Sequence, residues 1–204
     1  MIETVAFMPI RDARKLTPSP DTALISIHDA GEPASTDVPN TGWGYYNHIG
    51  FDDAAYSIEQ IEDHGKEFWD YFDGCARKVH ALRIKLMFKE IHNNREIRHI
   101  IVHCDAGRSR SAAVAKYYSE EHNLELEGDT SYANSLIYRL LQDPSYFDEA
   151  LQKHVEGKGK KADASTENRP FFPFGWLDRL INLLSFKWVD GVLEKIFGKP
   201  VNKD

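Results

Sequence analysis

Short runs of apolar and β-branched residues alternate with segments of helical spacing along most of the chain. Residues 3–10 and 22–28 (TALISIH) cluster such side chains around a charged turn and predict two early strands. A further short strand is predicted over 45–51. The run HIIVH at 99–103 is typical of an inner strand that is buried on both faces of a sheet.

Helical spacing begins after Asp53. Apolar residues recur there at intervals of three and four and predict helical structure that continues to His92, with Ile58, Ile61, Gly65, Phe68, Phe72, Val79, Leu82, Leu86 and Ile91 on the repeating face. The small-residue segment from Ser109 predicts another helix, directly after strand 99–103. A further helix is predicted over 134–141, with Leu136, Ile137, Leu140 and Leu141 on one side.

Composition divides the chain into three parts. The first part is a main domain, 1–155. Within it, the loop 31–44 is rich in glycine, proline and small polar residues and predicts irregular structure. Residues 156–169 have no large apolar side chain and read as a flexible linker. The aromatic-rich segment 170–204 predicts an amphipathic helical extension. We expect that tail to pack on the protein's own body or on a second copy, and less readily on a membrane surface.

Charge and cysteine content narrow the function classes. A formal net charge of -7 disfavours binding to nucleic acid, and 42% hydrophobic residues can fill a globular core. The chain has two cysteines and no apolar signal core near its start, so a cytoplasmic location is the expectation. No apolar run approaches the length of a membrane-spanning helix.

The strongest chemical signal is HCDAGRSRS at 103–111, which places Cys104 between the predicted strand and helix. Backbone N–H groups that converge in such a loop, beside a helix N-terminus, favour a thiolate, and a thiolate can attack phosphorus. Gly107 permits a backbone conformation that a Cβ would obstruct. Arg110 can bind phosphoryl oxygens in a bidentate way and stabilise the transition state. The predicted phosphate-binding loop consists of Asp105, Ala106, Gly107, Arg108, Ser109 and Arg110.

Two neighbours of this loop have predicted supporting roles. Ser111 can donate a hydrogen bond to the Cys104 sulfur, and His103 is expected to orient the loop from behind rather than to transfer protons. The leaving group also needs a general acid, for which the candidates are Asp53 first, then Asp52, then Asp29. Either Asp52 or Asp53 is alternatively the N-cap of the next helix. We expect no metal and no cofactor, because the histidines form no ligand pattern.

The motif HCDAGRSRS resembles the signature of cysteine-dependent protein tyrosine phosphatases, and its setting looks like the compact dual-specificity branch. The likeness covers about residues 1–150 and is widest with small bacterial and phage tyrosine-phosphatase-like proteins. It implies an α/β fold with a central, mostly parallel sheet of four or five strands flanked by helices. It also implies a metal-free mechanism through phosphocysteine. Asn134 is similar to the family asparagine that braces the phosphate loop, although an ordinary N-cap is an alternative.

The sequence constrains the substrate less than it constrains the chemistry of the reaction. Asp105 follows the nucleophile at a position where phosphatases of highly charged substrates commonly carry lysine, so a polyanionic substrate is disfavoured. A phosphotyrosine protein or peptide is the first expectation, ahead of phosphoserine or phosphothreonine and of a small phosphorylated metabolite. The rival from another class is a catalytically silent adaptor that only binds phosphate. Intact Cys104, Arg110 and Ser111 count against that rival.

Overall fold

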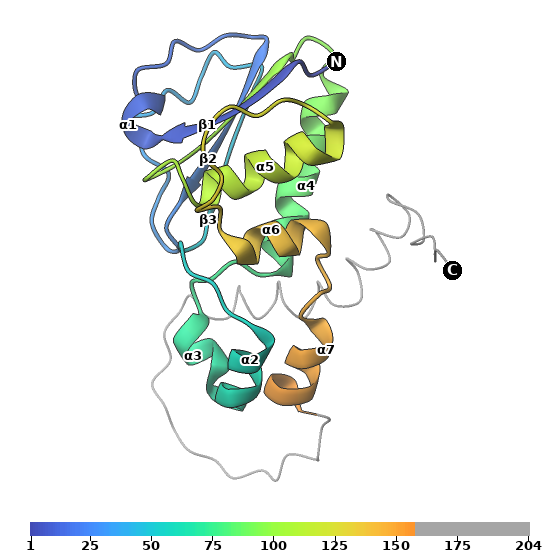
Figure 1. The fold of residues 1–204 in the computed structure, drawn as a ribbon. Coiled ribbons are helices and arrows are strands. Elements are labelled where there is room, and N and C mark those ends of the chain that lie inside the picture. The colour runs from blue at the N-terminus through green and yellow to red at the C-terminus, as the bar shows by residue number, and fades with distance from the viewer. Residues whose placement is uncertain (158–204) are drawn as a thin grey trace, which may run out of the picture. The chain divides into compact units, whose positions relative to one another are not determined.

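A single four-stranded parallel sheet organises the computed structural model, which describes residues 1–157 (Figure 1). The strands are β1 (Thr4–Pro9), β2 (Thr22–His28), β3 (Tyr45–Gly50) and β4 (His99–Cys104), in the spatial order β1-β4-β2-β3. All three strand pairs are parallel, which confirms the predicted α/β class and mostly parallel sheet. The carboxyl ends of the strands therefore meet at one edge.

β4 is an inner strand, as its run of β-branched residues predicts. It pairs with β1 on one side and with β2 on the other, and Ile100 and Val102 are fully buried. In the register of these pairs, His103 lies opposite Met8 of β1 and Ser26 of β2, and Cys104 lies opposite Pro9. His103, the first residue of the motif 103–111, is thus fixed between two neighbouring strands.

The two faces of the sheet are covered differently. One face packs on the helices α4 (Lys78–Asn93) and α5 (Arg110–His122) and holds the larger core (Figure 1). The shorter helix α6 (Ser135–Gln142) packs in turn on α4 and α5. The other face is covered by the short helix α1 (Ile10–Ala13) and the loop 31–44, around Leu24 and Val38. That loop contains no regular element, as predicted.

A second group of short helices packs together beyond the carboxyl edge of the sheet. It consists of α2 (Ile58–His64), the 3₁₀ turn η1 (Gly65–Glu67), α3 (Phe68–Phe72), α7 (Asp148–Leu151) and the π-helical turn η2 (Gln152–Glu156). Aromatic rings hold the group together: Tyr56 makes edge contacts with Phe68 and Phe147. Ser57 begins α2 with a capping box to Gln60.

The predicted helical pattern from 58 to 92 is correct in type, and its predicted face is buried only in part. Ile61, Phe68 and Ile91 are buried as the repeat predicts. The chain leaves helical structure at 73–77, which resets the phase of the repeat. Apart from Ile91, α4 then buries a different stripe, made of Ala81, Ile84, Met87 and Phe88. Val79 and Leu86 are instead 55% and 41% exposed. The predicted face of α6 is confirmed, because Leu136, Ile137, Leu140 and Leu141 are all buried.

Two predictions concern parts of the chain that the structure does not describe. The predicted tail at 170–204 and all but the first two residues of the predicted linker lie outside residues 1–157. Within residues 1–157, no helix combines the length and the apolar character needed to cross a bilayer.

Candidate active site

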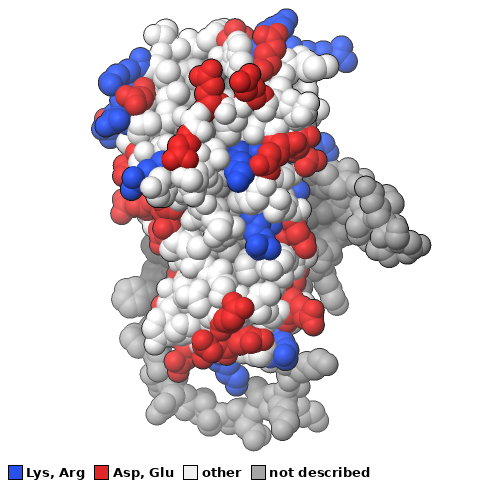
Figure 2. All heavy atoms as spheres, viewed as in Figure 1, with Lys and Arg blue, Asp and Glu red and all other residues white. Residues whose placement is uncertain are grey.

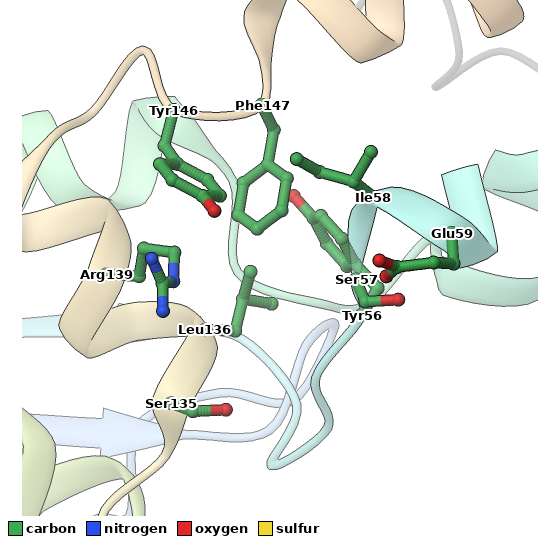
Figure 3. Close-up of a pocket in the computed structure, with 9 residues that line it drawn as sticks. All are labelled: Tyr56, Ser57, Ile58, Glu59, Ser135, Leu136, Arg139, Tyr146 and Phe147. Carbon is green, nitrogen blue, oxygen red and sulfur yellow. The ribbon is translucent and has the colours of Figure 1, made fainter. Parts of the chain in front are cut away.

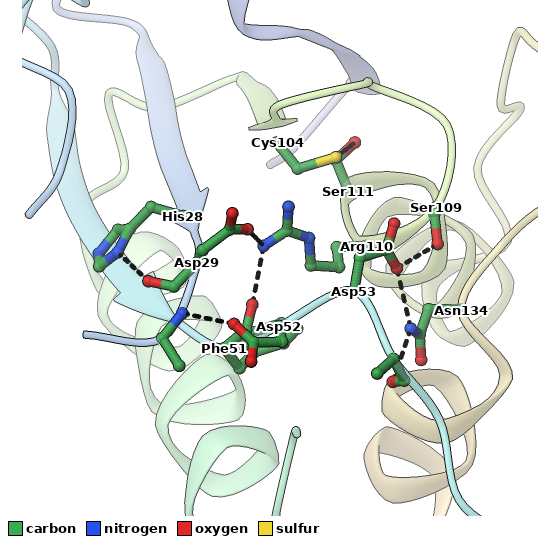
Figure 4. Close-up of polar contacts among 12 residues, drawn as sticks. His28, Asp29, Phe51, Asp52, Asp53, Cys104, Ser109, Arg110, Ser111 and Asn134 are labelled. Atoms are coloured by element: carbon green, nitrogen blue, oxygen red, sulfur yellow. Dashed lines mark hydrogen bonds and ion pairs between the residues drawn. The ribbon is translucent and has the colours of Figure 1, made fainter. Parts of the chain in front are cut away.

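The sulfur of Cys104 lies at the junction of β4 and α5, enclosed by its own loop (Figure 4). The residue is 1% exposed. The Cys104 Sγ is 3.2 Å from the Ser111 Oγ, and the Gly107 N–H donates to the same sulfur over 3.3 Å. Two hydrogen-bonding groups thus converge on the sulfur, and α5 begins at Arg110 with its positive N-terminal end beside it.

Gly107 is required by the way in which the loop packs on β1. Its φ of +67° lies in the left-handed region, and a Cβ on this residue would come 2.0 Å from the Pro9 nitrogen. The Ile10 N–H also donates to the Asp105 carbonyl over 3.2 Å. The end of the first strand therefore supports the loop from below and excludes a side chain at position 107.

Arg110 is buried and held on one nitrogen only. Its side chain is 4% exposed. Its Nη1 donates to the Phe51 carbonyl over 2.7 Å and forms an ion pair with the Asp29 Oδ1 at 2.6 Å. Its Nε is buried and has no hydrogen-bond partner among residues 1–157. In Figure 4 the second terminal nitrogen lies on the side of Cys104, away from Asp29. The edge of the guanidinium that suits a bidentate oxyanion is therefore free within the described part of the chain.

The predicted general acid, Asp53, reaches the loop. Its Oδ1 accepts hydrogen bonds from the Ser109 hydroxyl over 2.5 Å and from the Asn134 side-chain amide over 3.0 Å. Asp53 itself is exposed. The carboxylate thus lies beside the phosphate-binding loop, held by two neutral donors (Figure 4).

Asp52 points elsewhere. Its Oδ1 accepts from the Ala30 N–H over 2.9 Å, and its backbone N–H donates to the Gly74 carbonyl. The Asp52 Oδ2 lies so close to Gly74 that a Cβ there would come 1.8 Å from it. Burial raises the pKa of the nearby Cys75 thiol, and the Asp52 carboxylate raises it further. These contacts tie Asp52 to two backbone segments rather than to the loop of Cys104.

Asn134 combines the two roles that the sequence left open. Its Oδ1 accepts from the backbone N–H groups of Leu136 and Ile137, which makes it the N-cap of α6. Its Nδ2 donates to Asp53 and to the Ala54 carbonyl, and its backbone N–H donates to the Ser109 carbonyl over 3.2 Å. One residue thus begins a helix and connects the loop to the segment that carries Asp53.

His103 is buried behind the loop. Neither of its ring nitrogens has a hydrogen-bond partner among residues 1–157. Burial, with a smaller contribution from the neighbouring His28, lowers the pKa of His103 to about 4, so the ring is neutral at pH 7. His28 lies at the end of β2, where its Nε2 is 3.0 Å from the His48 Nδ1.

Exposed residues form the rim around the loop. Asp105, Ala106 and Arg108 are exposed, and the Arg108 guanidinium lies 5.6 Å from the centre of the Tyr132 ring. Tyr132 is 65% exposed. The sequence analysis did not single it out, although its position two residues before Asn134 was a usable signal.

A pocket of about 250 Å³ lies between α2 and α6 (Figure 3). Ser135, which lines it, directly follows Asn134, and Tyr56 lies three residues after Asp53. The Arg139 guanidinium projects from α6 and lies 4.5 Å from the centre of the Tyr146 ring. The pocket contains none of the predicted site residues, but two of the segments that form it continue from the candidate site.

Acidic and basic side chains are interspersed on the face shown in Figure 2, and they form no continuous basic area there. Among residues 1–157, no group of three or more His, Cys, Asp or Glu side chains is arranged to hold a metal ion.

Comparison with known proteins gives a distant structural likeness. No family profile and no curated protein matches the chain. Among solved structures, the chain is similar to Tk-PTP in its active form, at 14% sequence identity and a TM-score of 0.31. The match covers 76% of this chain and 84% of that one.

Proposed function

We propose that the protein is a phosphomonoester hydrolase that works through a phosphocysteine intermediate. The observation that carries this proposal is the buried Nε of Arg110, which has no partner among residues 1–157, in a guanidinium whose second terminal nitrogen faces the enclosed sulfur of Cys104. A buried N–H donor without a partner is costly unless an acceptor such as an anion binds there. A tetrahedral oxyanion fits, because it accepts from the guanidinium and from loop N–H groups at once.

The first step transfers the phosphoryl group to sulfur. The Cys104 thiolate attacks phosphorus, an S–P bond forms, and the P–O bond to the leaving group breaks. Asp53 donates a proton to the leaving oxygen, and Arg110 stabilises the charge on the equatorial oxygens. The contact of Asp53 with Ser109 keeps the carboxyl group close to the loop where that oxygen departs.

The second step regenerates the enzyme. Asp53 accepts a proton from water, the water oxygen attacks phosphorus, and the S–P bond breaks to release phosphate. Ser111, at 3.2 Å from the sulfur, donates a hydrogen bond to the departing thiolate. No step needs a metal ion or a cofactor.

A phosphotyrosine protein or peptide is the substrate that we favour. Tyr132 offers an exposed aromatic ring at the rim, on which the ring of a phosphotyrosine can stack. The pocket beside α6 offers a second place for a side chain of the same peptide. A small phosphorylated metabolite would use neither feature.

The test is hydrolysis of p-nitrophenyl phosphate in the presence of a chelator. We expect turnover that vanadate inhibits and that Cys104→Ser abolishes, while phosphate still binds to the variant. Cys75→Ser is the matched control, because Cys75 is also a buried, free cysteine but lies outside the motif 103–111. Turnover in Cys104→Ser would contradict the mechanism. Phosphate binding without any turnover by the native protein would support the adaptor instead.

A further inference from the structure

We propose that Asp29 is a positioning residue, which orients Arg110 for the oxyanion and does not transfer protons. This inference rests on the proposed function. The sequence places Asp29 only third among candidate acids. The structure brings its carboxylate to Arg110, 81 positions along the chain, over 2.6 Å.

The choice of nitrogen is what gives the contact its meaning. Arg110 has five N–H donors, and both of its anchors, Asp29 and the Phe51 carbonyl, take the same nitrogen, Nη1. Two anchors on one nitrogen fix the rotation of the planar guanidinium. They leave Nε and Nη2, the pair that forms a fork to two oxygens, for the ligand. Asp29 therefore holds Arg110 without occupying its binding edge.

The same contact argues against a proton-transfer role. A carboxyl group that protonates a leaving oxygen must be able to reach that oxygen. The Asp29 Oδ1 is instead engaged in an ion pair with a guanidinium that is almost fully buried. Asp53 accepts from neutral donors at the phosphate-binding loop and its neighbouring helix.

Hydrogen bonds on both sides of Asp29 fix its backbone. The His28 Nδ1 donates to the Asp29 carbonyl over 3.1 Å, because a carbonyl can only accept. On the other side, the Ala30 N–H donates to Asp52 over 2.9 Å. Asp52 thereby acquires a role that sequence analysis did not give it: it holds the segment from which Asp29 reaches Arg110 (Figure 4).

The experiment compares Asp29→Asn, Asp29→Ala and Asp29→Glu with the native protein in two measurements. The first is the inhibition constant of vanadate, which reports how well the loop binds an oxyanion. The second is kcat/KM for two aryl phosphates, one with a good leaving group (a nitrophenol) and one with a poor one (phenol).

We expect vanadate to bind about tenfold more weakly to Asp29→Asn and Asp29→Ala, since a small displacement of a binding group has effects of this size or larger. Both substrates should lose kcat/KM by the same factor, because positioning does not depend on the leaving group. Asp29→Glu should recover part of the loss. Asp37→Asn is the control: Asp37 is also an exposed partner of an arginine, Arg14, in a loop with no contact to Cys104. It should leave both measurements unchanged.

Three results would overturn the inference. A loss confined to the poor leaving group would make Asp29 a general acid. Tighter vanadate binding in Asp29→Asn would show that the carboxylate competes with the ligand. Unchanged vanadate binding would show that the ion pair has no role.

Calorimetric titration of Cys104→Ser with inorganic phosphate, with and without Asp29→Asn, separates this inference from the proposed function. The titration needs no turnover. Weaker phosphate binding in the double variant, beside a native protein without activity, would retain the positioning role and reject the hydrolase. An active native protein with equal phosphate affinities in the two titrations would do the opposite.

Discussion

Asp29 and Asp53 follow neighbouring parallel strands and lie on either side of Arg110, yet their surroundings suit them to different tasks (Figure 4). Asp29 contacts a buried cation, and Asp53 contacts a hydroxyl and an amide. The ion pair holds Asp29 against the guanidinium, whereas neutral groups hold Asp53 beside the phosphate-binding loop. The partner of each carboxylate, more than its distance from the loop, separates positioning from proton transfer.

The largest expected effect comes from Gly107→Ala, which disrupts the phosphate-binding loop on which the roles of both Asp29 and Asp53 depend. We expect no measurable hydrolysis of p-nitrophenyl phosphate and no phosphate binding by calorimetry. The added Cβ would come 2.0 Å from the Pro9 nitrogen, so β1 or the loop must move.

Gly31→Ala is the control for Gly107→Ala. Gly31 has a similar φ of +77°, but a Cβ there meets no atom within 4 Å. That variant bears the backbone strain alone, about 1 kcal/mol, and should keep its activity. Equal activities of the two variants would show that the contact with Pro9 is unimportant.

Asp53→Asn tests the side of the comparison that we assign to proton transfer. We expect kcat for phenyl phosphate to fall by roughly 10²- to 10⁴-fold, the range for loss of a general acid. The loss for p-nitrophenyl phosphate should be much smaller, because nitrophenolate departs without a proton. Steady-state kinetics on the two substrates measures both.

Asp52→Asn is the neighbouring control for the acid assignment. It removes the carboxylate that holds Ala30, so we expect a modest loss that is equal for the two substrates. A steeper dependence on the leaving group in Asp52→Asn than in Asp53→Asn would move the acid by one residue.

Acidification tests the histidines whose pKa is lowered by burial. Burial lowers the pKa of His103 and of His80 to about 4, and burial also lowers those of His48 and His92. Between the folded value and the unfolded value of 6.5, the unfolded chain binds more protons, so stability falls as the pH falls.

Urea unfolding of the native protein at pH 7 and pH 5 measures this loss. For His103 and His80 we expect about 2 kcal/mol each, from 1.36 kcal/mol per pH unit below 6.5. His103→Asn should show a smaller dependence on pH than the native protein. An equal dependence would mean that His103 is charged when folded.

The smallest effect concerns peptide recognition beyond the two carboxylates. Arg139→Ala removes a guanidinium from the pocket beside α6. We expect KM for a phosphotyrosine peptide with acidic flanking residues to rise a few-fold, as for loss of an exposed ion pair. The kcat/KM for p-nitrophenyl phosphate should not change. An equal effect on both substrates would place Arg139 outside peptide recognition.

Local patterns predicted most of the fold. Short apolar runs predicted all four strands. The patterns of β2 and β4 are the clearest, because these inner strands are mostly buried and have few polar positions. The face of α4 could not be predicted in the same way. That helix carries apolar side chains on two stripes, and the irregular segment 73–77 breaks the phase that would have chosen between them.

The candidate site was predictable as far as it is contiguous in sequence. The segment from Cys104 to Ser111 lies where one strand ends and one helix begins, so spacing alone indicates its geometry. The contacts of Arg110 with Asp29 and with the Phe51 carbonyl depend on which strands are neighbours. The order β1-β4-β2-β3 is a property of the whole sheet, and no local pattern contains it.

The packing of Pro9 beneath Gly107 has a consequence for the newly made chain. The two residues are separated by most of the main body of the sequence, and contacts between such distant segments form late in folding. β1 must pair with β4 before Pro9 can support the loop that follows β4. A partly assembled molecule should therefore be inert toward phosphate esters, and activity should appear only when assembly is complete.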